Sequence, residues 1–273
     1  MDRYAVIGNP IEHSRSPRIH ACFAAQTGVL LEYSKLLAPL DDFGGTVSHF
    51  FSSGGQGANV TVPFKEQAAG WVDVLAGVAE QALAVNTIFL DRGKRVGTNT
   101  DGMGLVRDLE MNLGWSLAGT RILVVGAGGA SRGVVGPLLE RKPDRLHVVN
   151  RTPDRAHRLV ERFAPASVGT RLSSSGLCDL QGGFDIVINA TSAGLDQQVP
   201  DLPTSVIAGA RCYDMVYGRD TAFCSWARQL GAAAVADGLG MLVEQAAEAF
   251  RIWRGVSPDT QPVIAELRAG LGA

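Results

Sequence analysis

The ten residues VVGAGGASRG, at positions 124–133, constrain the fold of this chain more than any other stretch. They combine a short apolar run, closely spaced glycines and the start of a helical pattern. This order is typical of the strand–turn–helix that opens a nucleotide-binding βαβ unit. Such a turn normally follows the first strand of its domain. Its place near the middle of 273 residues therefore predicts a second domain before it, and the chain is long enough for two cores.

The first hundred residues predict an α/β domain of their own. Four runs rich in β-branched and apolar residues are expected strands, and three amphipathic stretches ended by glycine are expected helices. The expected strands are 3–8, 31–38, 57–63 and 84–90, and the expected helices are 16–28, 41–55 and 64–77.

A second alternation of strands and helices begins after the turn signal NTDG, in which Asp101 can cap the next helix. This spacing predicts a doubly wound parallel sheet. The expected strands are 121–126, 145–150 and 184–191; the expected helices are 102–114, 130–142, 152–163 and 260–270, with a long apolar helical stripe over 233–255.

Composition excludes several classes of protein. The net charge of −2 argues against nucleic acid or an anionic membrane as a partner, and no apolar run is long enough to span a bilayer. The four cysteines are scattered without a CxxC pair, and the five histidines match no metal-ligand pattern, so we expect no metal site. The N-terminus reads as a strand rather than a signal peptide, which favours a cytoplasmic protein.

The glycine turn is expected to bind a dinucleotide. Gly126 would make the tight turn, Gly128 would let a pyrophosphate approach the backbone, and Ser131 stands at the third glycine position. A helix beginning near Ala130 would offer free N–H groups to phosphate. The alternative is a tight strand–helix turn without a ligand.

The end of the next strand favours NADP over NAD. NAD-binding folds usually have an acidic residue there, whereas this chain has Asn150, Arg151 and Thr152, with Arg155 one turn further. A guanidinium can grip a 2′-phosphate that a carboxylate would repel. The alternative is that Thr152 and Pro153 cap a helix and the arginines are solvated.

Polar side chains before residue 102 stand where a small polar substrate could bind. They follow successive expected strands, and ligands of α/β sheets bind at the carboxyl ends of strands. Each alone could be a cap, a turn or a solvated residue. They are Ser14, Ser16, Asn59, Thr61, Lys65, Asn86 and Asp101.

Taken in order, these motifs resemble those of the shikimate dehydrogenase family over nearly the whole chain. The motifs are GNPIEHSRSP, NVTVPFK, AVNT, NTDGMG, GAGGASRG, NRTPDRA, NATSAG, YDMVYG and GLGMLVEQAAEAF. The resemblance implies NADPH-dependent, reversible reduction of 3-dehydroshikimate to shikimate in aromatic amino-acid biosynthesis. One departure is Leu83, where the family often has glycine.

The resemblance also implies the roles of individual residues. Lys65 and Asp101 would be the catalytic pair, and Ser14, Ser16 and Tyr217 would bind the substrate carboxylate. Ring hydroxyls would be held by Asn59, Thr61, Asn86, Asp101 and Gln245. NADP would be bound by Gly126, Ala127, Gly128, Gly129, Ala130, Ser131, Asn150, Arg151, Thr152 and Arg155, with Thr191, Met215 and Gly238 nearer the nicotinamide.

The resemblance further implies a discontinuous substrate and catalytic domain, 1–101 plus 239–273, and a Rossmann-like NADP domain, 102–238, with a cleft between them. As an ammonium, Lys65 could polarise the substrate carbonyl and supply a proton, and a nearby Asp101 would favour that charged form. We expect a monomer or a homodimer.

Two alternatives remain open at this point. A relative that uses quinate as well as shikimate, often with NAD, is disfavoured by the arginines and by the paired serines. A non-catalytic sensor is disfavoured because Lys65 and Asp101 are both present.

Overall fold

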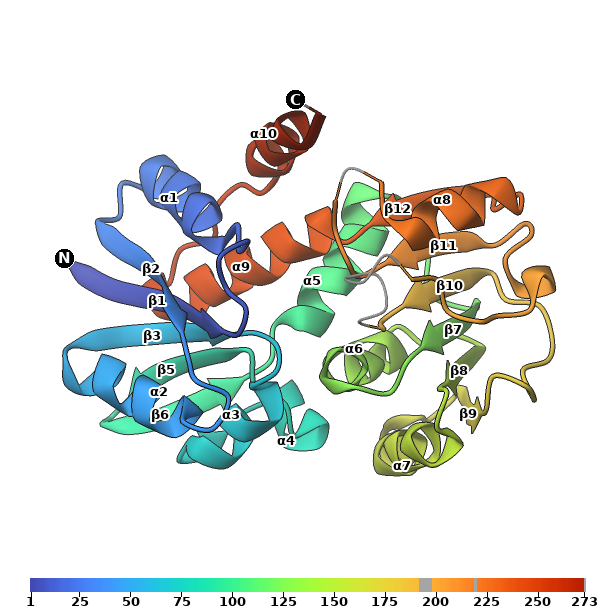
Figure 1. The fold of residues 1–273 in the computed structure, drawn as a ribbon, viewed down its shortest axis with the longest axis horizontal. Coiled ribbons are helices and arrows are strands. Elements are labelled where there is room, and N and C mark those ends of the chain that lie inside the picture. Colours follow the sequence, from blue (N-terminus) through green and yellow to red (C-terminus); the bar gives the residue numbers. More distant parts are fainter. Residues whose placement is uncertain (192–197, 219, 273) are drawn as a thin grey trace. The chain divides into compact units, whose positions relative to one another are not determined.

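The computed structural model describes residues 1–191, 198–218 and 220–272, which form two compact units (Figure 1). The first unit comprises Met1–Gly104 and Val243–Glu266, and the second comprises Leu105–Leu242 and the residues from Leu267 onward. The sequence expectation placed boundaries a few residues earlier, at 101 and 238, and assigned the whole C-terminal segment to the first domain. No helix within the described residues is long and apolar enough to cross a membrane.

The first unit contains a six-stranded sheet in the order β2-β1-β3-β5-β6-β4. Strands β1, β2 and β3 are parallel, whereas β5 is antiparallel to both β3 and β6. The elements are β1 (Asp2–Gly8), α1 (Ser16–Thr27), β2 (Leu31–Leu37), α2 (Phe43–Ser52), β3 (Gly55–Val60), α3 (Lys65–Trp71), β4 (Val74–Leu75), α4 (Val78–Ala82), β5 (Thr87–Asp91) and β6 (Lys94–Thr98). Helices α5 (Asp101–Arg107), α9 (Leu239–Arg254) and α10 (Gln261–Gly272) each contribute residues to both units.

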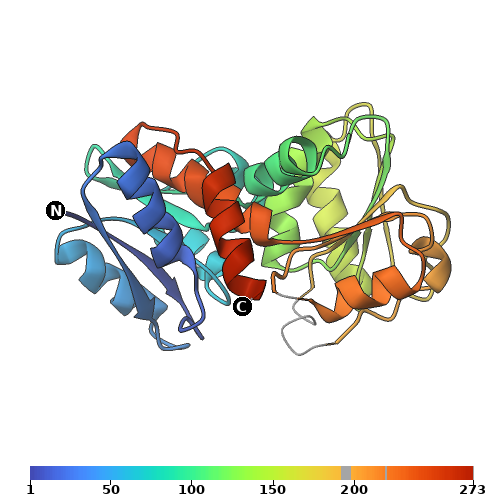
Figure 2. The same ribbon diagram turned by 90° about the horizontal axis from the view of Figure 1, so that it is seen from above.

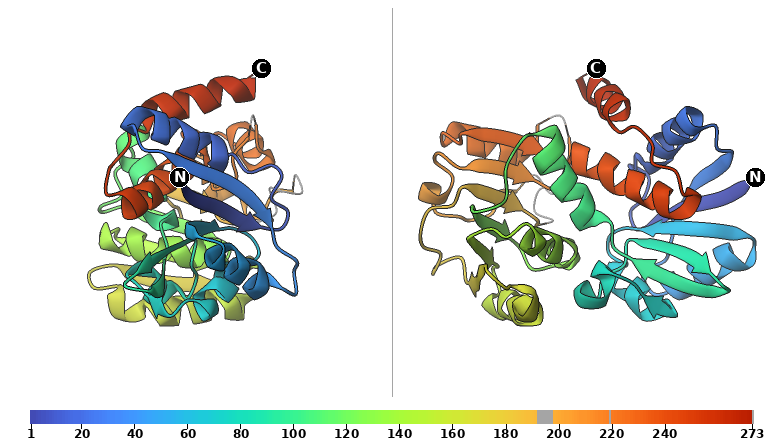
Figure 3. Two further views of the ribbon diagram at one scale, coloured as in Figure 1. Left: turned by 90° about the vertical axis from the view of Figure 1, so that its left-hand side faces the viewer. Right: turned by 180° about the vertical axis from the view of Figure 1, so that it is seen from behind.

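Helices cover both faces of this sheet (Figures 1 and 3). On one face, α2, α3 and α4 pack an apolar cluster that includes Phe43, Phe50 and Phe64. On the other face, α1 and α9 bring aromatic rings against the strands. His20 stacks on Tyr33 with ring centroids 4.2 Å apart. Further along the same layer, Trp253 stacks on Tyr4 at 4.7 Å.

The second unit contains a six-stranded, fully parallel sheet in the order β12-β11-β10-β7-β8-β9 (Figure 1; Figure 2 shows the unit from above). The first strand of the unit lies centrally and the chain winds outward in both directions, which is the order of a Rossmann-like sheet. The elements are β7 (Arg121–Val125), α6 (Gly129–Glu140), β8 (Arg145–Val149), α7 (Pro153–Phe163), β9 (Arg171–Ser175), β10 (Ile186–Asn189), β11 (Arg211–Asp214), α8 (Ala222–Gln229) and β12 (Ala234–Asp237).

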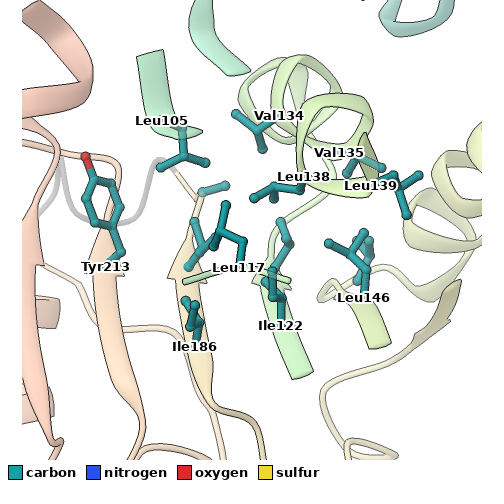
Figure 4. Packing of buried hydrophobic residues seen from close by; sticks show 14 of the residues in the cluster. Leu105, Leu117, Ile122, Val134, Val135, Leu138, Leu139, Leu146, Ile186 and Tyr213 are labelled. Atoms are coloured by element: carbon teal, nitrogen blue, oxygen red, sulfur yellow. The ribbon is translucent and has the colours of Figure 1, made fainter. Parts of the chain in front are cut away.

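Alternate residues of β7 face the two cores of this unit, because side chains alternate along a strand. Ile122 and Val124 belong to the cluster that also contains Val134 and Leu138 of α6, and Figure 4 shows Ile122, Leu138 and Val134 within it. Leu123 and Val125 belong to a second cluster, which includes residues of α8 and lies on the other face of the sheet. The predicted α/β architecture with a doubly wound parallel sheet is therefore confirmed.

Three expected helices differ from the structure. The helix expected over 64–77 ends at Trp71, because Val74 and Leu75 pair with β6 and Asp73 accepts hydrogen bonds from Arg95. The stripe over 233–255 begins as strand β12 rather than as helix. The helix expected over 102–114 changes to a π-turn at Asp108–Asn112.

The π-turn lies beside a buried carboxylate with several partners. Asp108 Oδ2 accepts hydrogen bonds from the Tyr213 hydroxyl at 2.6 Å and from the Met241 N–H at 3.1 Å. A Cβ on Gly240 would lie 1.9 Å from Asp108 Oδ1, so only glycine fits at that position. The carboxylate thus fixes the start of α9 against the second sheet.

Candidate active site

Lys65 and Asp101 form an ion pair at one edge of the first sheet. Lys65 is the first residue of α3, after β3, and Asp101 is the first residue of α5, after β6. The Lys65 Nζ atom lies 2.6 Å from Asp101 Oδ2, and the two side chains are 16% and 7% exposed. Both follow strands that run in the same direction, so their side chains meet at the carboxyl edge of the sheet. Asp101, expected to cap this helix, is itself its first residue, and its N–H donates to the side-chain oxygen of Asn99.

Asn86 holds the second oxygen of this carboxylate. Its Nδ2 donates to Asp101 Oδ1 at 2.8 Å, and its own Oδ1 accepts the Thr100 N–H at 2.8 Å. The expectation that Asn86 follows a strand is wrong, because it comes immediately before β5. Since β5 is antiparallel to its neighbours, its beginning lies at the same edge as the ends of β3 and β6.

Gln245 and Asn59 extend this polar network within the first unit. Gln245, on α9, accepts hydrogen bonds through Oε1 from Asn86 Nδ2 at 3.3 Å and from the Thr100 hydroxyl at 3.4 Å. Asn59, at the end of β3, donates through Nδ2 to the Asn86 carbonyl at 3.2 Å and to the Thr87 hydroxyl at 3.1 Å. The segment 243–266 thus reaches the N-terminal sheet through Gln245.

The remaining predicted residues of the first unit lie on segments that follow β1 and β3. Ser14 is in the loop after β1, and Ser16 is the buried first residue of α1. The Ser14 hydroxyl accepts the Ser16 N–H at 3.3 Å, and no side chain caps α1. Thr61 directly follows β3, and its N–H donates to the carbonyl of Ile7. The polar groups predicted for the substrate therefore gather at one edge of the first sheet, with one exception described below.

The glycine turn of the second unit has the shape that a dinucleotide pyrophosphate needs. Gly126 has a φ of +108°, and a Cβ there would lie 3.2 Å from the Ala190 carbonyl oxygen. At Gly128, by contrast, the position of a Cβ has no heavy atom within 4 Å, which leaves open space beside the backbone. No side chain caps the N-terminus of α6, so its N–H groups face this space.

Ser131 replaces the third glycine of the fingerprint and secures the turn. Its buried hydroxyl donates to the Gly126 carbonyl at 2.8 Å. The neighbouring predicted residues Ala127, Gly129 and Ala130 lie in the turn and in the first residues of α6. The residues present therefore fit a bound pyrophosphate.

Arg151 and Arg155 are exposed at the end of β8 and in α7, and neither has an ion-pair partner in the described part of the chain. Thr152 occupies the N-cap position of α7, but its side chain makes no capping hydrogen bond. Asn150 donates through Nδ2 to the Thr152 carbonyl at 2.9 Å, which orders the short connection. Two guanidinium groups are thus available to a phosphate at this end of the sheet.

The other predicted cofactor residues follow β10, β11 and β12. Thr191 donates to Asn189 Oδ1 at 2.8 Å, and a Cβ on Gly238 would lie 2.4 Å from the Met215 carbonyl oxygen. Tyr217, which was expected to bind the substrate carboxylate, belongs to the second unit, unlike the other predicted substrate residues. Residues 192–194 of the NATSAG motif lie outside the described residues.

Buried histidines do not compete for the acid–base role. Burial lowers the pKa of His20 to about 3 and that of His147 to about 4, so both rings are neutral at pH 7. His147 is hydrogen-bonded to Ser173 and Ser175 in the second sheet, and His13 is exposed. Across the described ranges, no group of three or more acidic, histidine or cysteine residues is placed to hold a metal ion.

Three residues that sequence reasoning did not propose belong to the network. Thr100 and Thr87 hydrogen-bond to Asn86, and Tyr33 donates to Asn59 Oδ1. Thr100 stands inside the quoted NTDG motif, which could have suggested it. Tyr33 carried no signal, because its contact depends on the order of the strands.

Comparison with protein families gives three matches along the chain. Residues 6–88 match the shikimate dehydrogenase substrate binding domain, residues 108–196 match shikimate / quinate 5-dehydrogenase, and residues 238–268 match the shikimate 5'-dehydrogenase C-terminal domain.

Individual relatives match over almost their full length. The shikimate dehydrogenase (NADP(+)) of Alkalilimnicola ehrlichii is 58% identical over 269 residues, which cover 98% of both chains. The structure of an Ael1 enzyme from Pseudomonas putida is 46% identical with a TM-score of 0.91, covering 98% of both chains. The shikimate 5-dehydrogenase of Thermus thermophilus, solved with NADP(H) and shikimate, is 34% identical with a TM-score of 0.87, covering 99% of this chain and 100% of that one.

Proposed function

This chain belongs to the shikimate dehydrogenase family, and we propose that it is the NADP-dependent oxidoreductase that interconverts 3-dehydroshikimate and shikimate. This reaction belongs to the shikimate pathway, which leads to the aromatic amino acids. The observation that carries the proposal is the Lys65–Asp101 ion pair, which lies among hydroxyl and amide groups able to bind a polyhydroxylated acid.

Lys65 is proposed to act as the general acid in the reducing direction. NADPH, when bound, supplies a hydride to the ketone carbon, and the carbonyl oxygen then gains a negative charge. The Lys65 ammonium can hydrogen-bond to that oxygen and give it a proton, which leaves a neutral amine to be reprotonated from water. In the oxidising direction, the neutral amine accepts the hydroxyl proton.

Asp101 is proposed to hold this lysine and to bind the substrate. One carboxylate oxygen contacts Lys65 and the other is held by Asn86, so the carboxylate has a fixed orientation. Fixed orientation favours catalysis, because the proton donor need not search for its position during the reaction. Ser14 and Ser16 are proposed to receive the substrate carboxylate, helped by Tyr217, and Thr61, Asn59 and Gln245 the ring hydroxyls.

NADP is proposed to bind along the carboxyl edge of the second sheet. The open space at Gly128 and the uncapped start of α6 support a pyrophosphate there. Arg151 and Arg155 support the 2′-phosphate, because a guanidinium makes paired, charge-assisted hydrogen bonds to phosphate. Thr191, Met215 and Gly238 are proposed to lie nearer the nicotinamide.

The proposal includes a cytoplasmic location, which is supported by the free thiols of all four cysteines. The state of assembly, monomer or homodimer, is a further prediction that light scattering of the purified protein tests.

The direct test follows nicotinamide absorbance while the purified protein receives shikimate or quinate with NADP+ or NAD+. We expect the highest kcat/KM with shikimate and NADP+. Faster oxidation of quinate with NAD+ would replace the proposal by a quinate dehydrogenase. Binding of both ligands without any turnover would instead support a non-catalytic sensor.

A further inference from the structure

Tyr33 is a side chain of the first unit that the proposed reaction does not use. It lies on β2, the edge strand, and its hydroxyl donates to Asn59 Oδ1 at 2.7 Å. Asn59 is on β3, and β1 lies between these two strands. Neighbouring strands are about 4.8 Å apart, so the contact spans roughly 10 Å of sheet. An aromatic side chain with a polar tip can bridge that width.

The hydrogen bonds of Asn59 fix its side-chain amide in one of its two flipped orientations. Both N–H groups of Nδ2 are used, by the Asn86 carbonyl and by the Thr87 hydroxyl. The oxygen, Oδ1, accepts the Tyr33 hydroxyl and keeps one further acceptor position. A flipped amide would face the Asn86 carbonyl with its oxygen and lose these bonds. Asn59 can therefore offer a ligand only an acceptor, and Tyr33 is the donor that secures this arrangement.

Tyr33 also lies near Ser16, a residue proposed to bind the substrate carboxylate. Burial raises the pKa of Tyr33 well above its ordinary value, while the nearby Ser16 side chain opposes that shift, so the hydroxyl is neutral at pH 7. The phenolic group thus stands between a residue after β1 and a residue at the end of β3.

The ring of Tyr33 is held in place by aromatic packing that does not need the hydroxyl. It stacks on His20 with an interplanar angle of 8°, and Trp253 lies 6.3 Å away. His20 is fully buried, and neither of its ring nitrogens has a hydrogen-bond partner among the described residues. The stack therefore acts through ring contact, which a phenylalanine at position 33 would keep.

We infer that Tyr33 is a positioning residue that sets the orientation of Asn59 for binding of the polyhydroxylated substrate. This inference rests on the proposed function. Tyr33 is proposed to touch no substrate atom and to act only through its hydrogen bond to Asn59.

Tyr33→Phe is the test, because it removes the hydroxyl and preserves the ring. We expect KM for shikimate to rise about tenfold, the effect of losing a hydrogen bond that orients a binding group. The value of kcat and KM for NADP+ should change less than about twofold. Tyr4→Phe is the matched control, since Tyr4 pairs with Tyr33 in the sheet register and its hydroxyl contacts Arg254 instead. We expect that control to leave KM for shikimate unchanged.

A double-mutant cycle with Asn59→Ala separates positioning from general packing. If Tyr33 acts largely through Asn59, adding Tyr33→Phe to Asn59→Ala should lower kcat/KM by less than about threefold. Fully additive losses, or an unchanged KM in Tyr33→Phe, would overturn the inference. Thermal unfolding of each variant checks that the fold is intact. If the parent enzyme shows no activity with shikimate and NADP+, the proposed function fails instead.

Discussion

The Lys65 ammonium lies 2.6 Å from the Asp101 carboxylate, although β4, α4 and the β5–β6 hairpin separate their helices in the sequence. We predict that Lys65→Ala lowers kcat by about 10²- to 10⁴-fold, because the developing alkoxide loses its proton donor. NADPH binding, followed by fluorescence titration, should be unchanged. Turnover within a few-fold of the parent would remove Lys65 from the mechanism.

A second ion pair in the same unit provides the control for this prediction. Asp73 and Arg95 also join the segment after α3 to β6, but both side chains are more than a third exposed. Exposed pairs contribute little to stability. Asp73→Asn should therefore leave kcat unchanged, which separates the loss of a proton donor from the loss of any ion pair between these segments.

Arg151 is predicted to select NADP. Because its guanidinium is exposed at the end of β8 without an ion-pair partner in the described residues, Arg151→Ala should raise KM for NADP+ about 10- to 100-fold. KM for NAD+ should change little, since NAD lacks the 2′-phosphate. Arg158→Ala, which changes an exposed arginine within α7, is the control. Equal losses with both nicotinamides would show that Arg151 does not read the phosphate.

Gly240 is predicted to be irreplaceable for stability. A Cβ at this position would lie 1.9 Å from Asp108 Oδ1, so Gly240→Ala must displace a carboxylate that holds Tyr213 and Met241. We expect the free energy of unfolding to fall by about 3 kcal/mol. Urea denaturation measures it. Gly270→Ala, in a helix position with no atom within 4 Å of the new Cβ, should instead be neutral or stabilising by up to about 1 kcal/mol.

His20 is predicted to make stability depend on pH. Its folded pKa, about 3, lies below the unfolded value of 6.5, so the unfolded chain binds the proton more readily. Its contribution to stability is therefore complete above pH 6.5 and decreases by about 1.4 kcal/mol for each pH unit below it. Urea denaturation at pH 7, 6 and 5 should show a shallower decrease in His20→Phe than in the parent. Parallel curves would contradict the assignment.

Helix ends and the glycine turn could be predicted from the sequence, because they depend on residues that lie close together in the chain. Helix α1 begins at Ser16 with Pro17 in its first turn and ends at Thr27, followed by the C-cap Gly28, whose φ is +69°. The glycine turn after β7 was likewise readable from its spacing. The meeting of Lys65 with Asp101 was expected from the family resemblance, since nothing in the spacing of two residues 36 positions apart specifies it.

The position of Asn86 and the end of α3 could not be predicted locally, because both depend on how distant strands pair. The direction of β5 decides which edge Asn86 occupies, and no local pattern encodes that direction. The pairing of Val74 with Val96 likewise ended a helix that the periodicity would have continued.

The structure explains locally why relatives often have glycine where this chain has Leu83. Leu83 ends α4 in the left-handed region with a φ of +46°, where a glycine would avoid the cost of a side chain.

The first unit is built from two segments that are far apart in the sequence, so its parts are synthesised at different times. All of its strands are made before the strands of the second unit, whereas Gln245, Phe250 and Trp253 are made after them. A Cβ on Gly57 would collide with the Trp253 ring, because the ring packs directly against the glycine backbone. Until Trp253 is synthesised, this space above β3 has no side chain to fill it. At typical elongation rates the delay is on the order of ten seconds, during which the nascent sheet shows apolar surface to chaperones. The unit that is started first is therefore completed only after all the strands of the second unit have been made.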